Sequence, residues 1–157
     1  MKKLTFATIE HIFDSNRKGA KYSVNGGKSY VNGGEFAEIA LKAGLGLDAS
    51  KDANTPFDEG SDIEELEMSV KSNKATLTSV KLGSDYNEVK ENYFKRVHST
   101  SWAWVVTYED ADSEAYIMNR EEFEEFMDNW SGFDKSRQVV RFKATSGKMV
   151  KWLEERV

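Results

Sequence analysis

The sequence predicts an α/β protein in which a central mixed β-sheet is flanked by helices. Segments with apolar residues at helical spacing, such as Phe36, Ile39, Ala40 and Ala43, are interspersed with segments typical of strands. One of the latter, residues 101–108, is aromatic and β-branched, as central strands often are. No repeat or linker divides the 157 residues, so we expect a single domain with a mixed sheet covered on both faces.

The first half of the chain is expected to hold two helices and then two strands. Gly44 can end the second helix, and Asn73-Lys74 lies where a tight turn would join the two strands. The expected order is a helix over 4–15, a glycine-rich polar loop over 16–33, a helix over 34–43, a polar stretch over 45–62, a strand over 63–71 and a strand over 75–82, with one more strand possible near 57–62.

The second half is expected to alternate strands and helices. Asn119 and Glu122 have the spacing of a capping box, which predicts a helix start. The expected order is a helix over 84–97, strands over 101–108 and 114–118, a helix over 119–130, a strand over 138–143 and a helix over 146–156.

Residues 62–71 combine a leading acid with a lysine at the end of a strand. In Asp62-Ile-Glu-Glu-Leu-Glu-Met-Ser-Val-Lys71, period two places Leu66, Met68 and Val70 on one face and Glu67, Ser69 and Lys71 on the other. Phosphodiester hydrolysis needs a metal to polarise the phosphate and a cation beside the developing charge. A carboxylate and a lysine on neighbouring backbone segments supply both.

This pattern resembles the PD-(D/E)xK nuclease superfamily, whose restriction endonuclease-like core has helix, strands, helix and strand in this order. The resemblance covers residues 34–108 and leaves 109–157 as a C-terminal β-α-β-α extension. It implies a metal-binding role for Asp62, a catalytic role for Lys71, and a helix glutamate that is Glu38 or Glu35. By helical spacing, Glu35, Glu38 and Lys42 share one face of their helix.

The middle acid of the family motif is replaced by Ser69. A restriction-enzyme branch of the superfamily also has Ser-Val-Lys, and there an acid of the following helix completes the metal site. The resemblance therefore implies Asp85 or Glu88 as the second ligand, with Glu67 as a further candidate. If none of the three reaches the metal, the resemblance implies a weak or inactive site.

Each part of this pattern also has a purely structural interpretation. An alternating polar strand face is commonly solvated, and Asp85 with Glu88 is also a capping box. Glu35 and Glu38 are acids in the first turn of a helix, where the helix dipole favours them. Asp58 competes with Asp62, because Pro56-Phe57-Asp58 also resembles the proline–aspartate signature.

Composition restricts the metal. The chain has no cysteine and only two histidines, so a metal must be held mostly by oxygen, which favours Mg²⁺, Mn²⁺ or Ca²⁺. With the resemblance, we expect Mg²⁺ or Mn²⁺. The absence of cysteine fits a cytoplasmic protein, and the sequence shows neither a signal peptide nor a membrane-spanning run.

The charges are unevenly distributed, although the net charge is −5. Residues 109–128 hold nine acids and one base, and residues 135–157 hold seven bases and two acids. Basic residues suit the phosphates of DNA, whereas acids suit the metal. The candidates for holding the nucleic-acid backbone are Arg141, Lys143, Lys148 and Lys151.

Two functions follow. The first is a metal-dependent nuclease that acts on DNA and can be a homodimer. The second is a non-catalytic interaction protein on the same fold, which binds nucleic acid or inhibits a host defence protein, with residues 109–128 imitating DNA. Both fit a looser resemblance to small proteins of bacterial phages and mobile elements, seen in residues 93–102 and 141–148.

Overall fold

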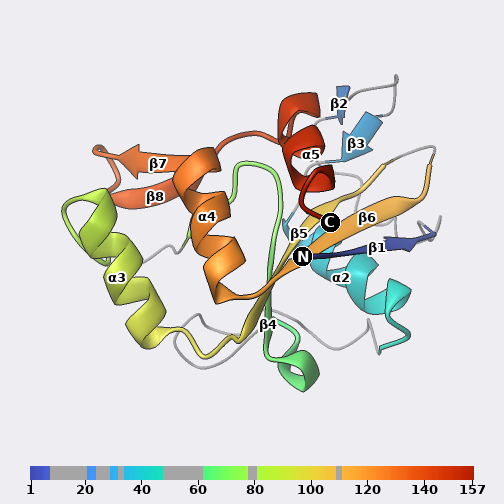
Figure 1. Cartoon of the computed structure of the whole chain (residues 1–157), viewed down its shortest axis with the longest axis horizontal. Coiled ribbons are helices and arrows are strands. Elements are labelled where there is room, and N and C mark those ends of the chain that lie inside the picture. Colours follow the sequence, from blue (N-terminus) through green and yellow to red (C-terminus); the bar gives the residue numbers. More distant parts are fainter. Residues whose placement is uncertain (8–20, 24–28, 32–33, 48–61, 78–80, 109–110) are drawn as a thin grey trace.

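The protein has a mixed α/β fold around a four-stranded sheet (Figure 1). The computed structural model describes residues 1–7, 21–23, 29–31, 34–47, 62–77, 81–108 and 111–157. The sheet has the order β1-β6-β5-β4, in which β4 and β5 are parallel and the other pairs are antiparallel. Its strands are β1 (Lys2–Phe6), β6 (Ser113–Met118), β5 (Ser101–Val106) and β4 (Met68–Lys71).

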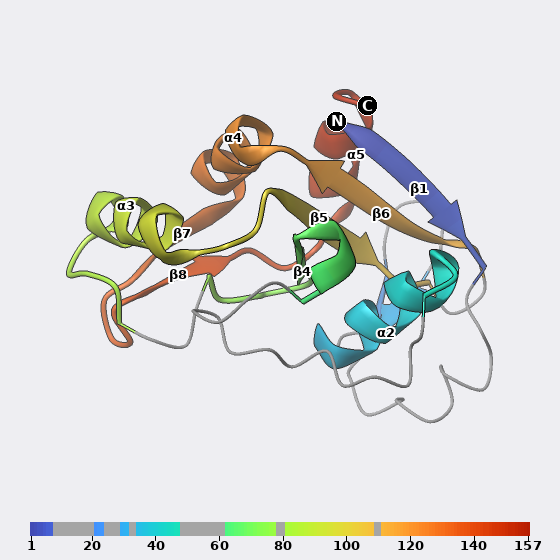
Figure 2. The ribbon, with the colours of Figure 1, turned by 90° about the horizontal axis from the view of Figure 1, so that it is seen from below.

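One face of the sheet is covered by α2 (Gly34–Gly44), which lies on the opposite side from α4 and α5 (Figure 2). Side chains on a strand alternate between faces, and on β5 the small residues Ala103 and Val105 point toward α2. They allow close approach of Ala37, Ala40 and Leu41 of the helix. The smaller of the two buried clusters forms here.

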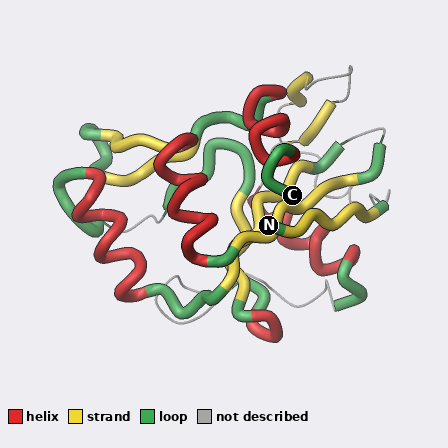
Figure 3. The backbone as a smooth tube through the Cα atoms, in the orientation of Figure 1, coloured by secondary structure: helices red, strands yellow, loops and turns green. Residues whose placement is uncertain are grey.

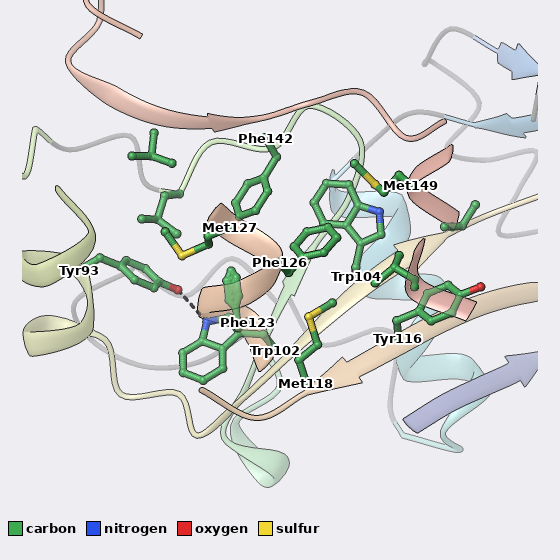
Figure 4. Packing of buried hydrophobic residues seen from close by; sticks show 14 of the residues in the cluster. Tyr93, Trp102, Trp104, Tyr116, Met118, Phe123, Phe126, Met127, Phe142 and Met149 are labelled. Carbon is green, nitrogen blue, oxygen red and sulfur yellow. Dashed lines mark hydrogen bonds between the residues drawn. The ribbon is translucent and has the colours of Figure 1, made fainter. Parts of the chain in front are cut away.

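The other face of β5 carries Trp102, Trp104 and Val106, which begin the larger, aromatic core (Figure 4). This face is covered by α3 (Tyr86–Arg96), α4 (Arg120–Trp130) and α5 (Gly147–Glu154). Trp102 stacks on Phe123 of α4 with ring centroids 5.1 Å apart, and Trp104 lies 5.0 Å from Phe126. The large side chains of β5 therefore explain why three helices gather on this side.

A separate β-ribbon lies beside α3 and α4 (Figure 3). It pairs β7 (Ser131–Asp134) with β8 (Val139–Phe142), and residues 75–77 join its edge. Leu77 N–H donates to Val140 O over 2.9 Å, and Phe142 N–H donates to Ala75 O over 2.8 Å. A second ribbon pairs β2 (Lys21–Ser23) with β3 (Ser29–Val31). The segment after β4 thus runs directly into the ribbon of the C-terminal part.

Much of the predicted secondary structure is confirmed. Helices lie within 34–44, 84–97, 119–130 and 146–156, and strands lie within 101–108, 113–118 and 138–143. The predicted caps form as well, because Asn119 and Glu122 make a reciprocal capping box and Asp85 accepts the N–H of Glu88 over 2.9 Å. Among the described helices, none combines the length and apolar character needed to cross a membrane.

Two predictions for the N-terminal part are wrong. Residues 4–6 belong to β1 instead of a helix, because pairing with β6 places Phe6 against α2 and Ala115; residues 8–15 lie outside the described part. The predicted loop over 16–33 contains β2 and β3, which pair with each other. Both cases show backbone pairing that local apolar spacing does not reveal.

The predicted strands around Lys71 are also corrected. Only Met68–Lys71 is a strand, because Glu64–Leu66 forms a 3₁₀ turn that leaves Leu66 44% exposed. Asn73-Lys74 does form a turn, in which Ala75 N–H donates to Ser72 O, but residues 75–77 pair with β8 and not with β4. The strand β7 was not predicted. The possible strand near 57–62 and Asp58 fall outside the described residues apart from Asp62.

Candidate functional site

Asp62 lies against the edge of β4. The chain reverses through the 3₁₀ turn, with Glu67 in the left-handed region at φ 47°, so that Ile63 and Met68 form an antiparallel bridge. One residue before this bridge, Asp62 Oδ2 accepts a hydrogen bond from the N–H of Val70 over 2.8 Å. Among the described strands β4 is at the edge of the sheet, so the carboxylate satisfies a backbone donor there.

Glu38 approaches the same place from α2. Its side chain is 9% exposed, and Oε2 has no hydrogen-bond partner in the described part of the chain. Burial raises the pKa of Glu38 to about 8, and the neighbouring Asp62 adds to the rise by repulsion and hydrogen bonding. Lys71 and Lys42 oppose the rise in this pKa. The four charged side chains therefore form one electrostatic group.

Two lysines enter the group from different elements. Lys71 ends β4, and its burial lowers the pKa of its ammonium group, while Asp62 and Glu38 act against that change. Lys42 follows Glu38 by one turn of α2 and is 7% exposed. Within the part that the structure describes, no ion pair within 4 Å joins either lysine to either carboxylate.

Ser69 faces the side of the sheet away from α2, toward α3. Its Oγ lies 2.5 Å from Ser99 Oγ, and Ser69 also hydrogen-bonds Tyr93. The Tyr93 hydroxyl accepts a hydrogen bond from Trp102 Nε1 over 2.9 Å (Figure 4). Burial raises the pKa of Tyr93 to about 12, so this phenol stays neutral. Ser69, at the middle position of the (D/E)xK pattern, is therefore part of a buried network of hydroxyl groups.

The other proposed metal ligands are placed elsewhere. Glu67 is exposed, and its carboxylate accepts from Thr100 Oγ1 over 3.3 Å. Asp85 and Glu88 lie at the start of α3, whereas Tyr93, which reaches Ser69, is eight residues after Asp85 and five after Glu88, or about 12 and 7.5 Å along a helix. Glu35 lies in α2, but its side chain is outside the described part. Of the proposed site residues, Glu38, Asp62 and Lys71 are those whose charges act on one another.

Glu38 and Asp62 are the residues of this site that could hold a divalent cation. No group of three acids or histidines suited to a metal occurs among the described side chains. Glu38 and Asp62 nevertheless offer two carboxylates, one of which has a buried oxygen without a partner. Mg²⁺ in phosphate-processing sites is typically held by one or two carboxylates, with water and substrate phosphate as further ligands. The two acids fit that arrangement.

The predicted nucleic-acid-binding residues lie on the exposed surface of β8 and α5 and the loop between them. Arg141, Lys143, Lys148 and Lys151 are exposed. Two contacts join this region to the segment after Lys71. Thr76 bridges Arg141, and the Thr145 N–H donates to Asn73 Oδ1 over 2.8 Å. The basic side chains therefore belong to a region that contacts the segment directly after β4.

Five of the seven acids that the structure describes within residues 109–128 pair with cations. Lys3 Nζ lies 2.9 Å from Glu114 Oε2, and Lys90 Nζ lies 3.1 Å from Asp128 Oδ1. Arg120 Nε lies 3.1 Å from Glu124 Oε1. Arg156 lies 3.5 Å from Glu125, and the N-terminal ammonium pairs with Glu122. These pairs reduce the negative potential that this segment presents to a partner.

No family model, curated protein or solved structure matches this chain. The site residue that the sequence pattern did not single out is Lys42, although its spacing from Glu38 places both on one helix face. Ser99 and Tyr93 were missed as partners of Ser69. Their proximity arises from the crossing of α3 over the sheet, which sequence spacing does not encode.

Proposed function

We propose that this protein is a metal-dependent phosphodiesterase that cleaves nucleic acid, with DNA as the expected substrate. The observation that carries the proposal is the buried, unpartnered Glu38 Oε2 beside Asp62, which is hydrogen-bonded to the edge of β4 close to Lys71 at the end of that strand. Placing the buried carboxylate of Glu38 next to the partly buried carboxylate of Asp62 is costly unless a cation or a proton compensates. A purely structural role would be served better by apolar side chains.

The proposed roles follow from the positions of the side chains. Glu38 and Asp62 would hold a Mg²⁺ or Mn²⁺ ion, which polarises a phosphodiester and favours attack by water. Lys71 would place a positive charge beside the phosphate as negative charge develops on it. Glu38, with its raised pKa, is a group that can exchange a proton near neutral pH.

The element order gives further support. A helix that carries Glu38 precedes β4, and β4 connects through α3 to the parallel strand β5. The expected order for a restriction endonuclease-like core is helix, strands, helix and strand. The chain shares the helix, the strand β4, the helix α3 and the strand β5 of that order, although residues 75–77 pair with β8 and not with β4. The basic residues Arg141, Lys143, Lys148 and Lys151 would contact the backbone phosphates, because they continue from the end of β4.

The test is cleavage of labelled single- and double-stranded DNA with Mg²⁺ or Mn²⁺, using the whole chain. Asp62→Asn and Lys71→Met should each reduce cleavage at least about 100-fold, as expected for loss of a metal ligand or a charge-stabilising group. Glu64→Gln is the matched control, because this nearby acid is exposed in the 3₁₀ turn. Its activity should equal that of the wild type.

Equal cleavage by the wild type, Asp62→Asn and Lys71→Met would contradict the proposal. So would the absence of any metal-dependent cleavage combined with an unchanged melting temperature in Mg²⁺ and Mn²⁺. That second result would favour the non-catalytic alternative, an interaction protein that binds nucleic acid or a host defence protein.

A further inference from the structure

The candidate site contains as many lysines as carboxylates. Glu38 and Lys42 come from α2, Lys71 from β4 and Asp62 from the segment beside that strand. Lys42 is more deeply buried than lysines usually are, at 7% exposure, and its charge acts on Glu38. With all four groups ionised their charges sum to zero, so a divalent cation would leave the site with a net charge of +2.

Such a charge balance weakens metal binding on its own. Each lysine repels an incoming cation, and repulsion is strong in a poorly solvated site. Two carboxylates also leave most positions around Mg²⁺ or Mn²⁺ to other oxygens. A phosphodiester would relieve both deficits, since it brings a negative charge and oxygen ligands together.

We infer that Lys42 is a second cationic residue of the site, which together with Lys71 makes binding of a divalent cation depend on a phosphodiester anion. This inference rests on the proposed function and specifies how that site is regulated. Lys42 acts here as a positioning residue, through the charge it places next to Glu38. By linkage, the anion would be bound more tightly in the presence of the cation by the same factor.

Replacing Lys42 should change the affinity for the cation in the opposite direction from replacing a lysine that only supports the structure. Its removal should strengthen binding of the cation alone, because one repulsive charge is lost. The same change should weaken the cooperation between cation and anion. A lysine that only supports α2 would, when replaced, lower stability and metal affinity together.

The experiment measures Mn²⁺ binding to the whole chain by electron paramagnetic resonance, at constant ionic strength. The anion probe is dimethyl phosphate, a phosphodiester without bases, and trimethyl phosphate is its neutral control. In the wild type, dimethyl phosphate should tighten Mn²⁺ binding about three- to tenfold, as expected for one added charge in a partly solvated site. Trimethyl phosphate should have no effect.

The variant is Lys42→Met, which keeps the length of the side chain and removes its charge. It should bind Mn²⁺ alone about three- to tenfold more tightly than the wild type and should show less than about twofold tightening with dimethyl phosphate. Lys42→Arg should behave like the wild type. Lys95→Met controls for the change in net charge, because Lys95 is exposed on α3 and pairs with Glu91.

Three results would overturn the inference. One is wild-type Mn²⁺ affinity that dimethyl phosphate does not change, and another is a Lys42→Met variant with unchanged Mn²⁺ affinity and cooperation. If either occurs while DNA cleavage still depends on Asp62 and Mn²⁺, the proposed function stands and only the role of Lys42 falls. The third, no Mn²⁺ binding with or without dimethyl phosphate, would overturn both.

Discussion

The side-chain carboxylate of Asp62 accepts a hydrogen bond from the backbone N–H of Val70 over 2.8 Å. This contact holds an acid beside a strand that ends one residue later at Lys71. It depends on the 3₁₀ turn of Glu64–Leu66, which returns the chain along the edge of β4. Asp62 and Lys71, which are nine residues apart in the sequence, therefore both lie at β4.

Glu38 should make the protein less stable as the pH rises from about 4.5 to about 8. Its pKa is about 8 in the folded chain and 4.5 in its unperturbed state, so in this range the folded form keeps a proton that the unfolded form has released. The free energy of unfolding contributed by this group therefore falls with increasing pH. Urea unfolding across this range should show a shallower decline for Glu38→Gln than for the wild type, and equal slopes would contradict the assignment.

Introducing an acid at position 69 should not create a metal site. Ser69 is 6% exposed and points toward Ser99 and Tyr93, so the carboxylate of Ser69→Asp would be buried among hydroxyl groups. We expect a loss of about 2–4 kcal/mol in unfolding free energy, against about 1 kcal/mol for Ser69→Ala. Titration with Mn²⁺ should show no gain in affinity, and a clear gain would mean that the side chain turns toward Asp62.

Replacing Gly44 by a larger residue should destabilise the contact between α2 and β1. A Cβ atom there would lie 2.6 Å from Phe6 Cγ, so Gly44→Ala should lower the free energy of unfolding by about 1–3 kcal/mol. Gly46→Ala is the comparison, because that position has open space but a φ of +73° and should cost about 1 kcal/mol. Chemical denaturation measures both, and a neutral Gly44→Ala would show that Phe6 can move aside.

The exposed basic residues near α5 should contribute to nucleic-acid affinity without selecting a sequence. Each of Arg141→Ala, Lys143→Ala, Lys148→Ala and Lys151→Ala should weaken binding of an oligonucleotide and lower the slope of log affinity against log salt by about one. Fluorescence anisotropy at several salt concentrations provides the measurement. Lys135→Ala, in the turn between β7 and β8, is the control, and an equal effect there would indicate unspecific charge attraction.

Most elements with strong local signals could be predicted from the order of the amino acids. The apolar spacing of α2 and α4, the capping residues Asp85 and Asn119, and the aromatic β5 all predict their elements correctly, because these preferences act within a few residues. The same holds for the prediction of a mixed sheet with helices on both faces.

Which polar residues meet depends on how the helices and strands pack, and local spacing does not predict it. Leu4 and Phe6 fit a helical pattern but lie in β1, since pairing with β6 outweighs local preference. The packing of α2 on the sheet brings Glu38 to Asp62, and the path of α3 places Tyr93 next to Ser69. Such contacts join segments far apart in the chain, and their positions follow from how whole elements pack, which no local spacing expresses.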